Sequence, residues 1–383
     1  MIKKDRNINS EKGGLRILEK SSDIERIGLL TGGGDCPGLN AVIRSVVKPA
    51  IHKHGIEVLG IADGYDGLVQ NRTSQLSWDD VSGILTQGGT ILGASNKANP
   101  FNYYPPYEKD KEPEDMSERC VENFESNNLD ALVCVGGDGT LTIAKGLQEL
   151  GIPVVGVPKT IDNDVFGTDV TFGFDTASQI VADAVDRLHT TAQSHRRVMV
   201  VETMGRYTGW LALSGGLAGG GDIILIPELE YTIEGVCNAI RDRHRRGRKF
   251  SIVVISEGVK KPTGEFVKKN NVEESEDPIR LGGISSFIAD EIEERTDVET
   301  RATVLGHVQR GGTPTARDRV LATRFGYEAL NAVVNEEFGR MVALKGTDIR
   351  TVSLEKVANR QRKVDPEGQL VKTARSIETY LGD

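Results

Sequence analysis

Six consecutive residues gather side chains that can do chemistry within one short turn: Lys159, Thr160, Ile161, Asp162, Asn163 and Asp164. They follow the apolar run 152–157, which predicts a buried strand, and open α/β sheets bind ligands just past the carboxyl ends of their strands. Asp162 and Asp164 place two carboxylates in this one turn, of which one could serve as a general base while the other faces a metal. A solvated turn, which Asp and Asn favour, explains the same residues without chemistry, so the other motifs must decide.

Glycine-rich turns follow several other predicted strands. Residues 31–38 follow a strand predicted over 26–30, and residues 136–140 follow one predicted over 131–135. Such turns let backbone N–H groups approach a phosphate closely, although glycine also serves packing alone. The chain contains no G-x-x-x-x-G-K-[ST] sequence, so neither turn is a Walker A loop. Four further stretches have a similar character: 87–93, 204–206, 257–258 and 306–312.

Strand patterns alternate with helical patterns almost throughout the chain. The other elements that must position these turns are strands predicted over 58–62, 198–202, 222–227 and 251–256 and helices predicted over 40–51 and 177–190. Residues 100–118, with Pro, Tyr and mixed charges, predict a surface loop. The basic cluster between residues 241 and 249 is typical of a solvated helix end. The alternation indicates a parallel α/β architecture.

Length, charge and cysteine content bound the class of protein. With 383 residues the chain is longer than a single hydrophobic core usually serves, so two domains are expected. Its 38% hydrophobic and 27% charged residues fit a soluble globular protein, and its net charge of -9 argues against nucleic-acid binding. No run of about 18 apolar residues predicts a membrane span, and residues 1–25 are too charged for a secretory signal. The cysteines show no metal-binding spacing, which favours a reduced, cytoplasmic setting.

Six of these stretches together resemble the 6-phosphofructokinase family in their order and context: 31–38, 136–140, 158–164, 204–206, 257–258 and 306–312. The resemblance covers the chain from about Ile27 onward. The Gly-Gly-Asp-Gly-Thr sequence at 136–140 alone is also shared by groups that resemble NAD kinases and lipid kinases. The family fold implies an α/β protein with two doubly wound, Rossmann-like domains and mostly parallel sheets.

The resemblance also implies domain boundaries and a reaction. Residues 24–173 plus 309–359 would bind the phosphoryl donor and Mg²⁺, and residues 174–308 plus 360–383 would bind the sugar phosphate, after an N-terminal extension 1–23. The implied reaction transfers a phosphoryl group from ATP to the 1-hydroxyl of fructose 6-phosphate and gives fructose 1,6-bisphosphate and ADP. Mg²⁺ would be the cofactor.

The family pattern assigns roles residue by residue. The implied catalytic residues are Asp162, Thr160, Arg206 and Lys159. The donor site would be formed by Gly33, Gly34, Asn96, Lys97, Gly137, Asp138, Gly139 and Thr140, with Gly33 and Gly34 supplying backbone N–H groups to the phosphates. Asp162 would take the proton from the sugar hydroxyl, and Arg206 would steady the transferring phosphoryl group. Asp138 and Asp164 would be arranged around Mg²⁺, in part through water, because Mg²⁺ keeps part of its hydration shell.

The implied sugar-phosphate site draws on several motifs: Thr160, Asp162, Asp164, Arg197, Met204, Gly205, Arg206, Glu257, Arg301, His307 and Arg310. Arginine forks match phosphate oxygens, and Glu257 would accept hydrogen bonds from sugar hydroxyls. In the family, residues matching Arg197 and Arg301 reach across a subunit interface into the neighbour's site. A homo-oligomer with shared sites, commonly a homotetramer, is therefore expected.

A few residues bear on the identity of the phosphoryl donor. Gly139 stands where pyrophosphate users resemble one another in carrying an aspartate, which would crowd and repel the α-phosphate of ATP. Lys159 is typical of pyrophosphate users, yet a subset of ATP users combines the same glycine and lysine. Many ATP users have an arginine where Asn96 stands, next to Lys97, and a small glycine in the adenine pocket where residues 142–143 stand. The glycine favours ATP, with pyrophosphate as the alternative donor.

Two other functional classes stay open. An NAD-kinase-like enzyme would leave residues 204–206 and 306–312 without a role. A non-catalytic regulatory subunit would not need both Asp162 and Arg206, which are present.

The residues that would form an allosteric site match the family pattern only in part. Effector-binding family members use basic residues between subunits, which here correspond to Arg44, Arg246, Arg248 and Lys249. Asp222 lies where those enzymes have a glutamate near the effector, whereas His189 stands in place of an arginine.

Overall fold

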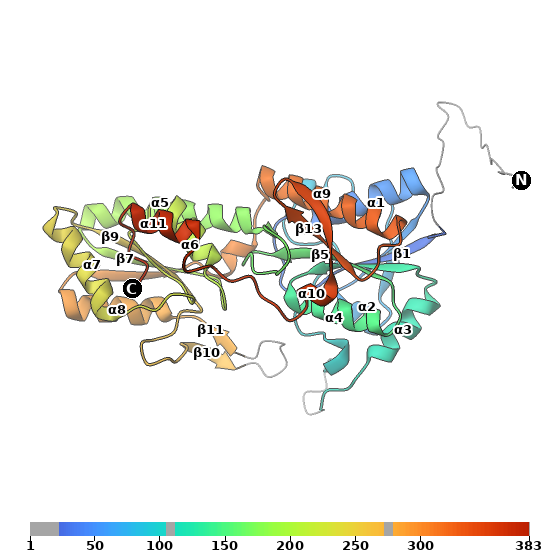
Figure 1. The fold of residues 1–383 in the computed structure, drawn as a ribbon, viewed down its shortest axis with the longest axis horizontal. Coiled ribbons are helices and arrows are strands. Elements are labelled where there is room, and N and C mark those ends of the chain that lie inside the picture. Colours follow the sequence, from blue (N-terminus) through green and yellow to red (C-terminus); the bar gives the residue numbers. More distant parts are fainter. Residues whose placement is uncertain (1–22, 105–111, 272–278, 383) are drawn as a thin grey trace, which may run out of the picture.

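The computed structural model describes residues 23–104, 112–271 and 279–382, which form two α/β lobes set side by side along the long axis of the molecule (Figure 1). Each lobe is a twisted sheet between layers of helices. Apart from Asp23, the predicted N-terminal extension 1–23 lies outside the described residues. No helix within the described ranges is long and apolar enough to cross a membrane.

The first lobe is built on a sheet with the strand order β14-β13-β5-β4-β1-β2-β3, in which β6 also pairs with β5. Its strands are β1 (Arg26–Thr31), β2 (Glu57–Ile61), β3 (Thr73–Gln75), β4 (Ala131–Gly136), β5 (Val154–Thr160), β6 (Phe172–Gly173), β13 (Arg340–Lys345) and β14 (Asp348–Ser353). All pairings are parallel except β2 with β3 and β13 with β14. The central strands β1, β4 and β5 are buried almost throughout, as expected of a parallel sheet covered on both faces.

The second lobe is built on a smaller parallel sheet with the order β12-β7-β9-β8. Its strands are β7 (Val198–Thr203), β8 (Ile223–Leu225), β9 (Ser251–Ser256) and β12 (Thr300–Val304). A separate antiparallel pair is formed by β10 (Lys268–Asn271) and β11 (Ile279–Leu281). The edge strand β12 is largely exposed, unlike β7 and β9, which are fully buried.

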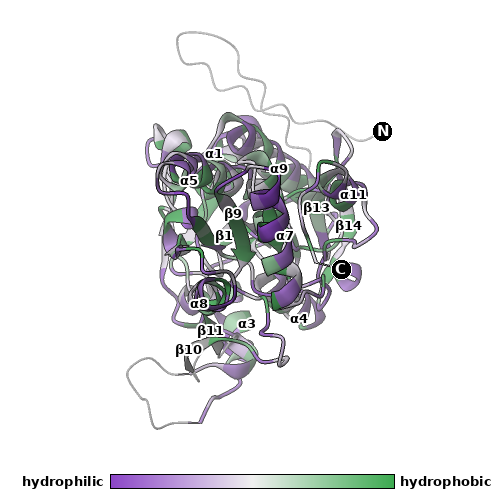
Figure 2. Ribbon diagram, turned by 90° about the vertical axis from the view of Figure 1, so that its left-hand side faces the viewer, coloured by the Kyte–Doolittle hydropathy of each residue, from purple (hydrophilic) through white to green (hydrophobic). Residues whose placement is uncertain are grey.

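Helices cover both faces of each sheet. In the first lobe they are α1 (Leu39–Pro49), α2 (Tyr65–Val69), α3 (Ser117–Ser126), α4 (Asp138–Glu149), α9 (Ala316–Val334) and α10 (Leu354–Val357). In the second lobe they are α5 (Phe174–His195), α6 (Trp210–Ala218), α7 (Ile233–Arg245), α8 (Ile284–Thr296) and α11 (Gln369–Ser376). One hydrophobic core runs beneath α1, α9, α5, α6 and α11 and so joins the two lobes, while each opposite face has its own core. Figure 2 shows the apolar strands enclosed by helices such as α7, whose polar residues face outward.

The strand order creates a topological switch point in each sheet. Although β1 and β4 are neighbours, the chain leaves β1 toward β2 on one side and leaves β4 toward β5 on the other. In the second sheet the neighbours β7 and β9 also have connections that run in opposite directions. Ligands bind outside the carboxyl ends of strands at such points. The loops after these four strands contain four of the six motifs: 31–38, 136–140, 204–206 and 257–258.

The predicted strands and helices are confirmed, with shifted ends. The strand predicted over 152–157 runs on to Thr160, so Lys159 and Thr160 belong to the strand and the turn begins after them. The strand predicted over 222–227 is shorter, because β8 covers only three residues. The helix predicted over 40–51 ends as an α-helix at Pro49, where a π-helix, Ala50–His54, takes over.

The surface loop predicted over 100–118 is wrong at both ends. A 3-10 helix, Pro100–Asn102, begins it, and α3 starts at Ser117. Phe101 packs against the backbone of Gly146 in α4, and Tyr103 is buried. These apolar contacts anchor the ends, while residues 105–111 lie outside the described part of the chain.

The chain crosses between the lobes more than once. The predicted division into 24–173 plus 309–359 and 174–308 plus 360–383 stays a prediction. The sheets place β13 and β14 with the first lobe, and α11 packs on the second. Figure 1 shows the red segment between α10 and α11 running from one lobe to the other.

Asp318 is expected to hold the two lobes together. Its Oδ2 accepts hydrogen bonds from Thr176 N at 2.8 Å and Thr176 Oγ1 at 2.6 Å, which joins the start of α9 to the start of α5. Asp318→Ala should destabilise the protein by about 1–3 kcal/mol, because two buried donors lose their acceptor. Asp318→Asn should cost less, since its amide oxygen can still accept both bonds. Thermal unfolding of the three proteins checks this, and equal midpoints for Asp318→Ala and the parent would contradict it.

Candidate active site

The loops after β5 in the first lobe and after β7 and β9 in the second lobe meet between the lobes. Thr208 Oγ1 of the second lobe donates a hydrogen bond to the carbonyl oxygen of Asp162 at 3.4 Å. Arg206, after β7, and Glu257, after β9, lie close enough for the charge of Asp162 to shift the pKa of each. Three predicted site residues from distant parts of the sequence are therefore neighbours.

Thr140 sets the spacing of the two glycine turns in the first lobe. Its side chain lies against the backbone of Gly32, after β1, and of Gly136, at the end of β4, so a Cβ atom at either glycine would overlap it. The Tyr65 hydroxyl donates to the carbonyl oxygen of Thr140 at 2.8 Å. Because α4 begins at Asp138, its first N–H groups and its positive dipole end lie in the same place, which favours an anion there.

Two cations hold the carbonyl groups of the turn after β1. Lys159 Nζ, which is almost fully buried, donates to the carbonyl oxygen of Gly34. Arg310 Nη1 donates to the carbonyl oxygen of Asp35 at 3.1 Å, and its guanidinium fills the space where a Gly34 side chain would lie. Burial is the largest influence on the Lys159 ammonium and lowers its pKa. The turn is thus held by charges as well as by its glycines.

The backbone N–H of Gly33, predicted to contact a phosphate, has a hydrogen-bond partner within the protein. The N–H of Gly33 donates to the carbonyl oxygen of Ser95 at 3.0 Å. Ser95 precedes the exposed residues Asn96 and Lys97, and its hydroxyl accepts from Lys97 N at 3.2 Å. In this arrangement Gly33 binds the loop that carries Asn96 and Lys97, and thereby brings both predicted donor-site residues to the glycine turn.

Hydrogen bonds curl the turn that follows β5. Asn163 has a left-handed backbone with φ 54°, and its Oδ1 accepts from Thr171 N at 3.0 Å. Thr171 Oγ1 donates to the carbonyl oxygen of Thr160 at 2.8 Å, and Thr160 Oγ1 accepts from Asp162 N at 3.0 Å. These local Asx and hydroxyl hydrogen bonds bend the chain into a turn after Thr160. Asp162 and Asp164 end up within reach of each other's charge.

Three carboxylates, Asp138, Asp162 and Asp164, form the acidic part of the site. Burial raises the pKa of each, and the charge of Asp162, with a smaller effect of Asp138, helps to raise the pKa of Asp164 to about 7. The cations that lower the pKa of Asp162 are Arg310, Lys159 and Arg206. The Oδ1 atoms of Asp138 and Asp162 are buried and have no hydrogen-bond partner among the described residues. These oxygens point to ligands that the protein alone does not supply.

Backbone contacts lock the loops after β7 and β9 together. The N–H of Gly258 donates to the carbonyl oxygen of Gly205 at 3.0 Å, and Ser256 Oγ donates to the same oxygen. Gly205 has a φ of 125°, and a Cβ atom on Gly258 would overlap the carbonyl group of Arg206. Burial, and then the charge of Asp162, raises the pKa of the neighbouring Glu257 to about 7. The lock fixes Arg206 and Glu257 relative to each other.

A 3-10 helix, Gly306–Arg310, carries the last predicted site residues. Its buried Gln309 donates from Nε2 to the carbonyl oxygen of Gly306 at 3.0 Å and accepts at Oε1 from Met204 N at 3.3 Å. Gln309 therefore ties this helix to the loop after β7. His307 is exposed, whereas Arg310 turns toward the glycine loop of the first lobe. Sequence reasoning passed over Gln309, although a polar residue inside a motif was the available signal.

The chain is similar to known proteins in sequence and in fold. The sequence profile described as Phosphofructokinase matches residues 26–333. The chain belongs to the phosphofructokinase family. It is 50% identical to ATP-dependent 6-phosphofructokinase 2 of Clostridium perfringens, over 94% of this chain and 99% of the relative. It is 49% identical to the pyrophosphate–fructose 6-phosphate 1-phosphotransferase of Amycolatopsis methanolica, over 89% and 97%. Pichia pastoris phosphofructokinase in the T-state matches with a TM-score of 0.75 and 30% identity, over 93% of this chain and 36% of that one.

Two arginines of the family pattern do not join the site of their own chain. Arg197 precedes β7 and Arg301 lies near the start of β12, whereas the site lies at the carboxyl ends of the strands. A strand of 6 residues such as β7 places these ends about 20 Å apart. Both arginines pair with Glu299, Arg197 at 3.2 Å and Arg301 at 2.7 Å. Their predicted role in this phosphofructokinase family member needs a second chain.

The acidic residues of the site suit Mg²⁺ bound together with phosphates and water better than a metal bound by protein side chains alone. Within the described ranges, no three or more His, Cys, Asp or Glu side chains lie close enough together to hold a metal. Mg²⁺ is usually bound by one or two carboxylates together with substrate phosphates and water. Asp138 and Asp164 supply two carboxylates, and the unpartnered Oδ1 of Asp138 fits such a ligand.

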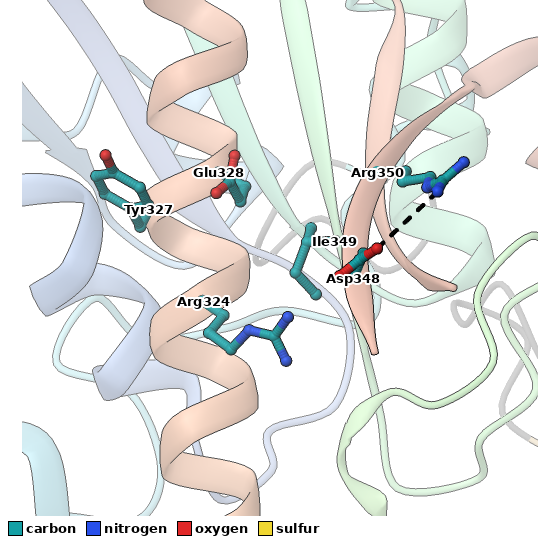
Figure 3. Close-up of a pocket in the computed structure, with 6 residues that line it drawn as sticks. All are labelled: Arg324, Tyr327, Glu328, Asp348, Ile349 and Arg350. Atoms are coloured by element: carbon teal, nitrogen blue, oxygen red, sulfur yellow. Dashed lines mark ion pairs between the residues drawn. The ribbon is translucent and has the colours of Figure 1, made fainter. Parts of the chain in front are cut away.

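A surface hollow of about 440 Å³ lies away from this site, between α9 and β14 (Figure 3). It is lined by Arg324, Tyr327, Glu328, Asp348, Ile349 and Arg350. Asp348 and Arg350 form an ion pair at 3.9 Å. None of the predicted site residues lines it, and its mixed charges match no single ligand chemistry.

Gly258→Ala is expected to disturb the lock between the two loops of the second lobe. The added Cβ meets backbone atoms of Arg206, which cannot move without shifting the loop. Gly264→Ala is the matched control, because a Cβ there meets no atom within 4 Å and costs only the strain of its φ of 84°, about 1–2 kcal/mol. Thermal unfolding should show a clearly lower midpoint for Gly258→Ala. A larger loss for Gly264→Ala would contradict the close packing.

Proposed function

We propose that this phosphofructokinase family member transfers the γ-phosphoryl group of ATP to the 1-hydroxyl of fructose 6-phosphate. The observation that carries the proposal is the carboxylate of Asp162, whose buried Oδ1 has no hydrogen-bond partner among the described residues and which lies among cations from both lobes. A hydroxyl that is about to attack a phosphorus atom is the partner this oxygen lacks. Relatives named ATP-dependent 6-phosphofructokinase, at 48–50% identity, support the same reaction.

Asp162 acts as the general base. It accepts the proton of the sugar 1-hydroxyl while the hydroxyl oxygen attacks the γ-phosphorus of ATP. Burial raises the pKa of Asp162, whereas Arg310, Lys159 and Arg206 favour its charged form. The curled turn at Asn163 holds the carboxylate in place. Burial and the three cations thus act on this carboxyl group in opposite directions, which suits a group that must accept a proton during the reaction.

The transferring phosphoryl group is stabilised mainly by charge and position. Arg206 approaches from the second lobe and Lys159 from the end of β5, so the group would lie between cations of both lobes. The first turn of α4 offers N–H groups to the donor phosphates, with Gly137, Gly139 and Thr140 at its start. Thr160, next to Lys159, supplies a hydroxyl.

Asp138 and Asp164 are the residues that would hold Mg²⁺. The ion supplies positive charge that neutralises the phosphate oxygens during transfer. Burial raises the pKa of both carboxyl groups, and a nearby divalent cation favours their charged forms. Asp138 stands at the start of α4, so both its carboxylate and the helix terminus face the donor phosphates.

Sugar-phosphate recognition would use both lobes. Thr160, Asp162 and Asp164 belong to the first lobe, and Glu257 of the second lobe accepts from sugar hydroxyls. His307 and Arg310 lie on the 3-10 helix that Gln309 ties to the loop after β7. Met204 and Gly205 form the loop wall, which Gln309 and Gly258 hold in place.

Shared sites are the proposed reason for an oligomer. Arg301 is half-exposed near the start of β12, which forms an open sheet edge, and Arg197, 19% exposed, precedes the neighbouring strand β7. A second copy placed there would receive both arginines at its phosphate site, and a homotetramer satisfies this for every chain. The four cysteines are buried and unbridged, which suits the proposed cytoplasmic location.

Allosteric control stays a prediction. Asp222, in the position of the effector-binding glutamate, pairs with Arg243 at 2.7 Å, and Arg246 pairs with Glu378 at 2.7 Å. An effector phosphate would have to compete with these carboxylates. His189 instead binds the carbonyl oxygen of Gly219 at 2.9 Å.

ATP, rather than pyrophosphate, is the expected donor. Initial rates with fructose 6-phosphate and Mg²⁺ should show turnover with ATP and little with pyrophosphate. Gly139→Asp should raise the KM for ATP by about tenfold or more, because a carboxylate a few ångströms from a phosphate costs on the order of 1–4 kcal/mol. Gly139→Asn is the control, since it adds the same bulk without the charge.

The opposite outcomes are informative as well. Turnover with pyrophosphate alone would overturn the donor assignment and make Lys159 and Asn96 the deciding residues. No turnover with either donor would favour the regulatory-subunit alternative.

Mixed oligomers should recover activity that each of two variants lacks. Asp162→Asn should lower kcat by about 10²–10⁴-fold with little change in the KM for fructose 6-phosphate, because it removes the base. Arg301→Ala should instead raise that KM. When the two chains are co-expressed, a site that combines Asp162 of one chain with Arg301 of its neighbour is intact. Mixed oligomers without any such recovery would show that each site uses one chain only.

A further inference from the structure

Residues 358–364, the first part of the segment that joins α10 to α11, contact the site at three successive points. We call these residues the crossing strap. The backbone N–H of Asn359 donates to Thr142 Oγ1 at 3.3 Å and also lowers the pKa of Asp138, beside the start of α4. Gln361 forms an antiparallel bridge with Val165, directly after the catalytic turn. The strap thus passes the donor side and then the base before it enters the second lobe (Figure 1).

Arg362 makes the central contacts of the strap. Its backbone N–H donates to the carbonyl oxygen of Asp164 at 2.7 Å, and its Nη1 donates to the carbonyl oxygen of Asn163 at 3.1 Å. The preceding carbonyl, that of Asp162, accepts from Thr208 at 3.4 Å. All three successive carbonyl groups of the catalytic turn are therefore held from outside their own strand.

The other side of Arg362 is fixed to the second lobe. Its guanidinium stacks on the ring of Trp210, with Cζ 4.0 Å from the ring centroid, and its carbonyl oxygen accepts from Trp210 Nε1 at 2.8 Å. Trp210 is the first residue of α6, which begins shortly after Arg206. Glu228 completes the attachment by accepting from Val364 N at 2.9 Å and from Gly209 N.

We propose that Arg362 is a positioning residue that keeps the base Asp162 in register with the phosphoryl-binding Arg206. This role requires no contact with a substrate: Arg362 holds the turn of the base through two carbonyl groups and the Arg206 loop through Trp210. The two groups belong to different lobes, and Arg362 adds a direct link between their loops to the shared core and the Thr208 hydrogen bond. This inference rests on the proposed function, because it assigns Asp162 and Arg206 their roles.

Arginine suits this position better than lysine. A planar guanidinium can stack on an indole face and donate in its own plane to a carbonyl oxygen at the same time, whereas an ammonium cannot do both. Burial lowers the pKa of Arg362, while the nearby Asp169 raises it. The neighbouring Arg360 differs, since it is exposed and its guanidinium lies 5.7 Å from the ring of Phe166, at the surface.

The kinetic test compares Arg362→Ala and Arg362→Lys with the control Arg360→Ala. A misplacement of the base by about 1 Å costs on the order of 10²-fold in rate, so Arg362→Ala should lower kcat by about 10–100-fold. The KM values for ATP and fructose 6-phosphate should change by less than about threefold, because the ground-state contacts stay in place. Arg362→Lys should recover part of the loss, and Arg360→Ala should behave as the parent. A parent-like kcat for Arg362→Ala would overturn the proposal. An equal kcat for Arg362→Lys and Arg362→Ala would overturn it as well.

A double-mutant cycle separates positioning from a general loss of structure. If Arg362 acts through Asp162, Arg362→Ala should have almost no further effect on kcat once Asp162→Asn has removed the base. An equal fold-loss in both backgrounds would assign Arg362 a structural role only. The ratios are taken with whichever donor, ATP or pyrophosphate, supports turnover of the parent, so failure of the donor assignment and failure of this inference give different results.

Fluorescence provides a readout that does not depend on turnover. The chain has 2 tryptophans, so Trp78→Phe leaves Trp210 as the sole reporter. Trp78 lies on the surface beside Lys48, away from the site. In this background Arg362→Ala should change the emission of Trp210, and Arg360→Ala should not. Unchanged emission in Arg362→Ala would show that the stack is absent in solution and would overturn the inference.

Discussion

A partly buried carboxylate, that of Asp162, whose Oδ1 is shielded from water, is the constraint on which the rest of the structure depends. Taking an ion out of water costs several kcal/mol unless opposite charges and fixed dipoles replace the solvent. Here the replacements come from separate elements: Lys159 from β5, Arg206 from the loop after β7 and Arg310 from the 3-10 helix. Because these elements belong to two lobes, the lobes need a fixed relative position. The hydrophobic core that runs through both of them provides it.

The sequence predicted the parts of the fold and site that are local. Buried parallel strands read as continuous apolar runs, so β1, β4, β7 and β9 were recognised within a residue or two. The glycines at positions 32 and 136 mark places where Thr140 leaves no room for a Cβ atom, which is a constraint that a sequence records directly. The order of the motifs along the chain then sufficed to recognise the family.

The sequence could not predict contacts that depend on distant partners. β13 returns to pair with β5, Arg340 opposite Val155, and no local pattern indicates that neighbour. The curl at Asn163 depends on Thr171, which reads as an ordinary strand residue. The carbonyl of Ser95 that occupies the N–H of Gly33 is a backbone group and therefore has no signature at all. Burial of a charged residue such as Lys159 likewise depends on the whole fold rather than on its neighbours in sequence.

The contact between Arg310 and the carbonyl oxygen of Asp35 has a thermodynamic consequence. The proposed sugar-phosphate site uses the same guanidinium, which already donates a hydrogen bond to the loop proposed to face the phosphoryl donor. A ligand that recruits it must first release that loop, so the free energy of binding one substrate contains a part that belongs to the other. Such coupling is reciprocal by necessity, whatever the order in which the substrates arrive. With the proposed roles, this one side chain would make the two half-sites a single linked system.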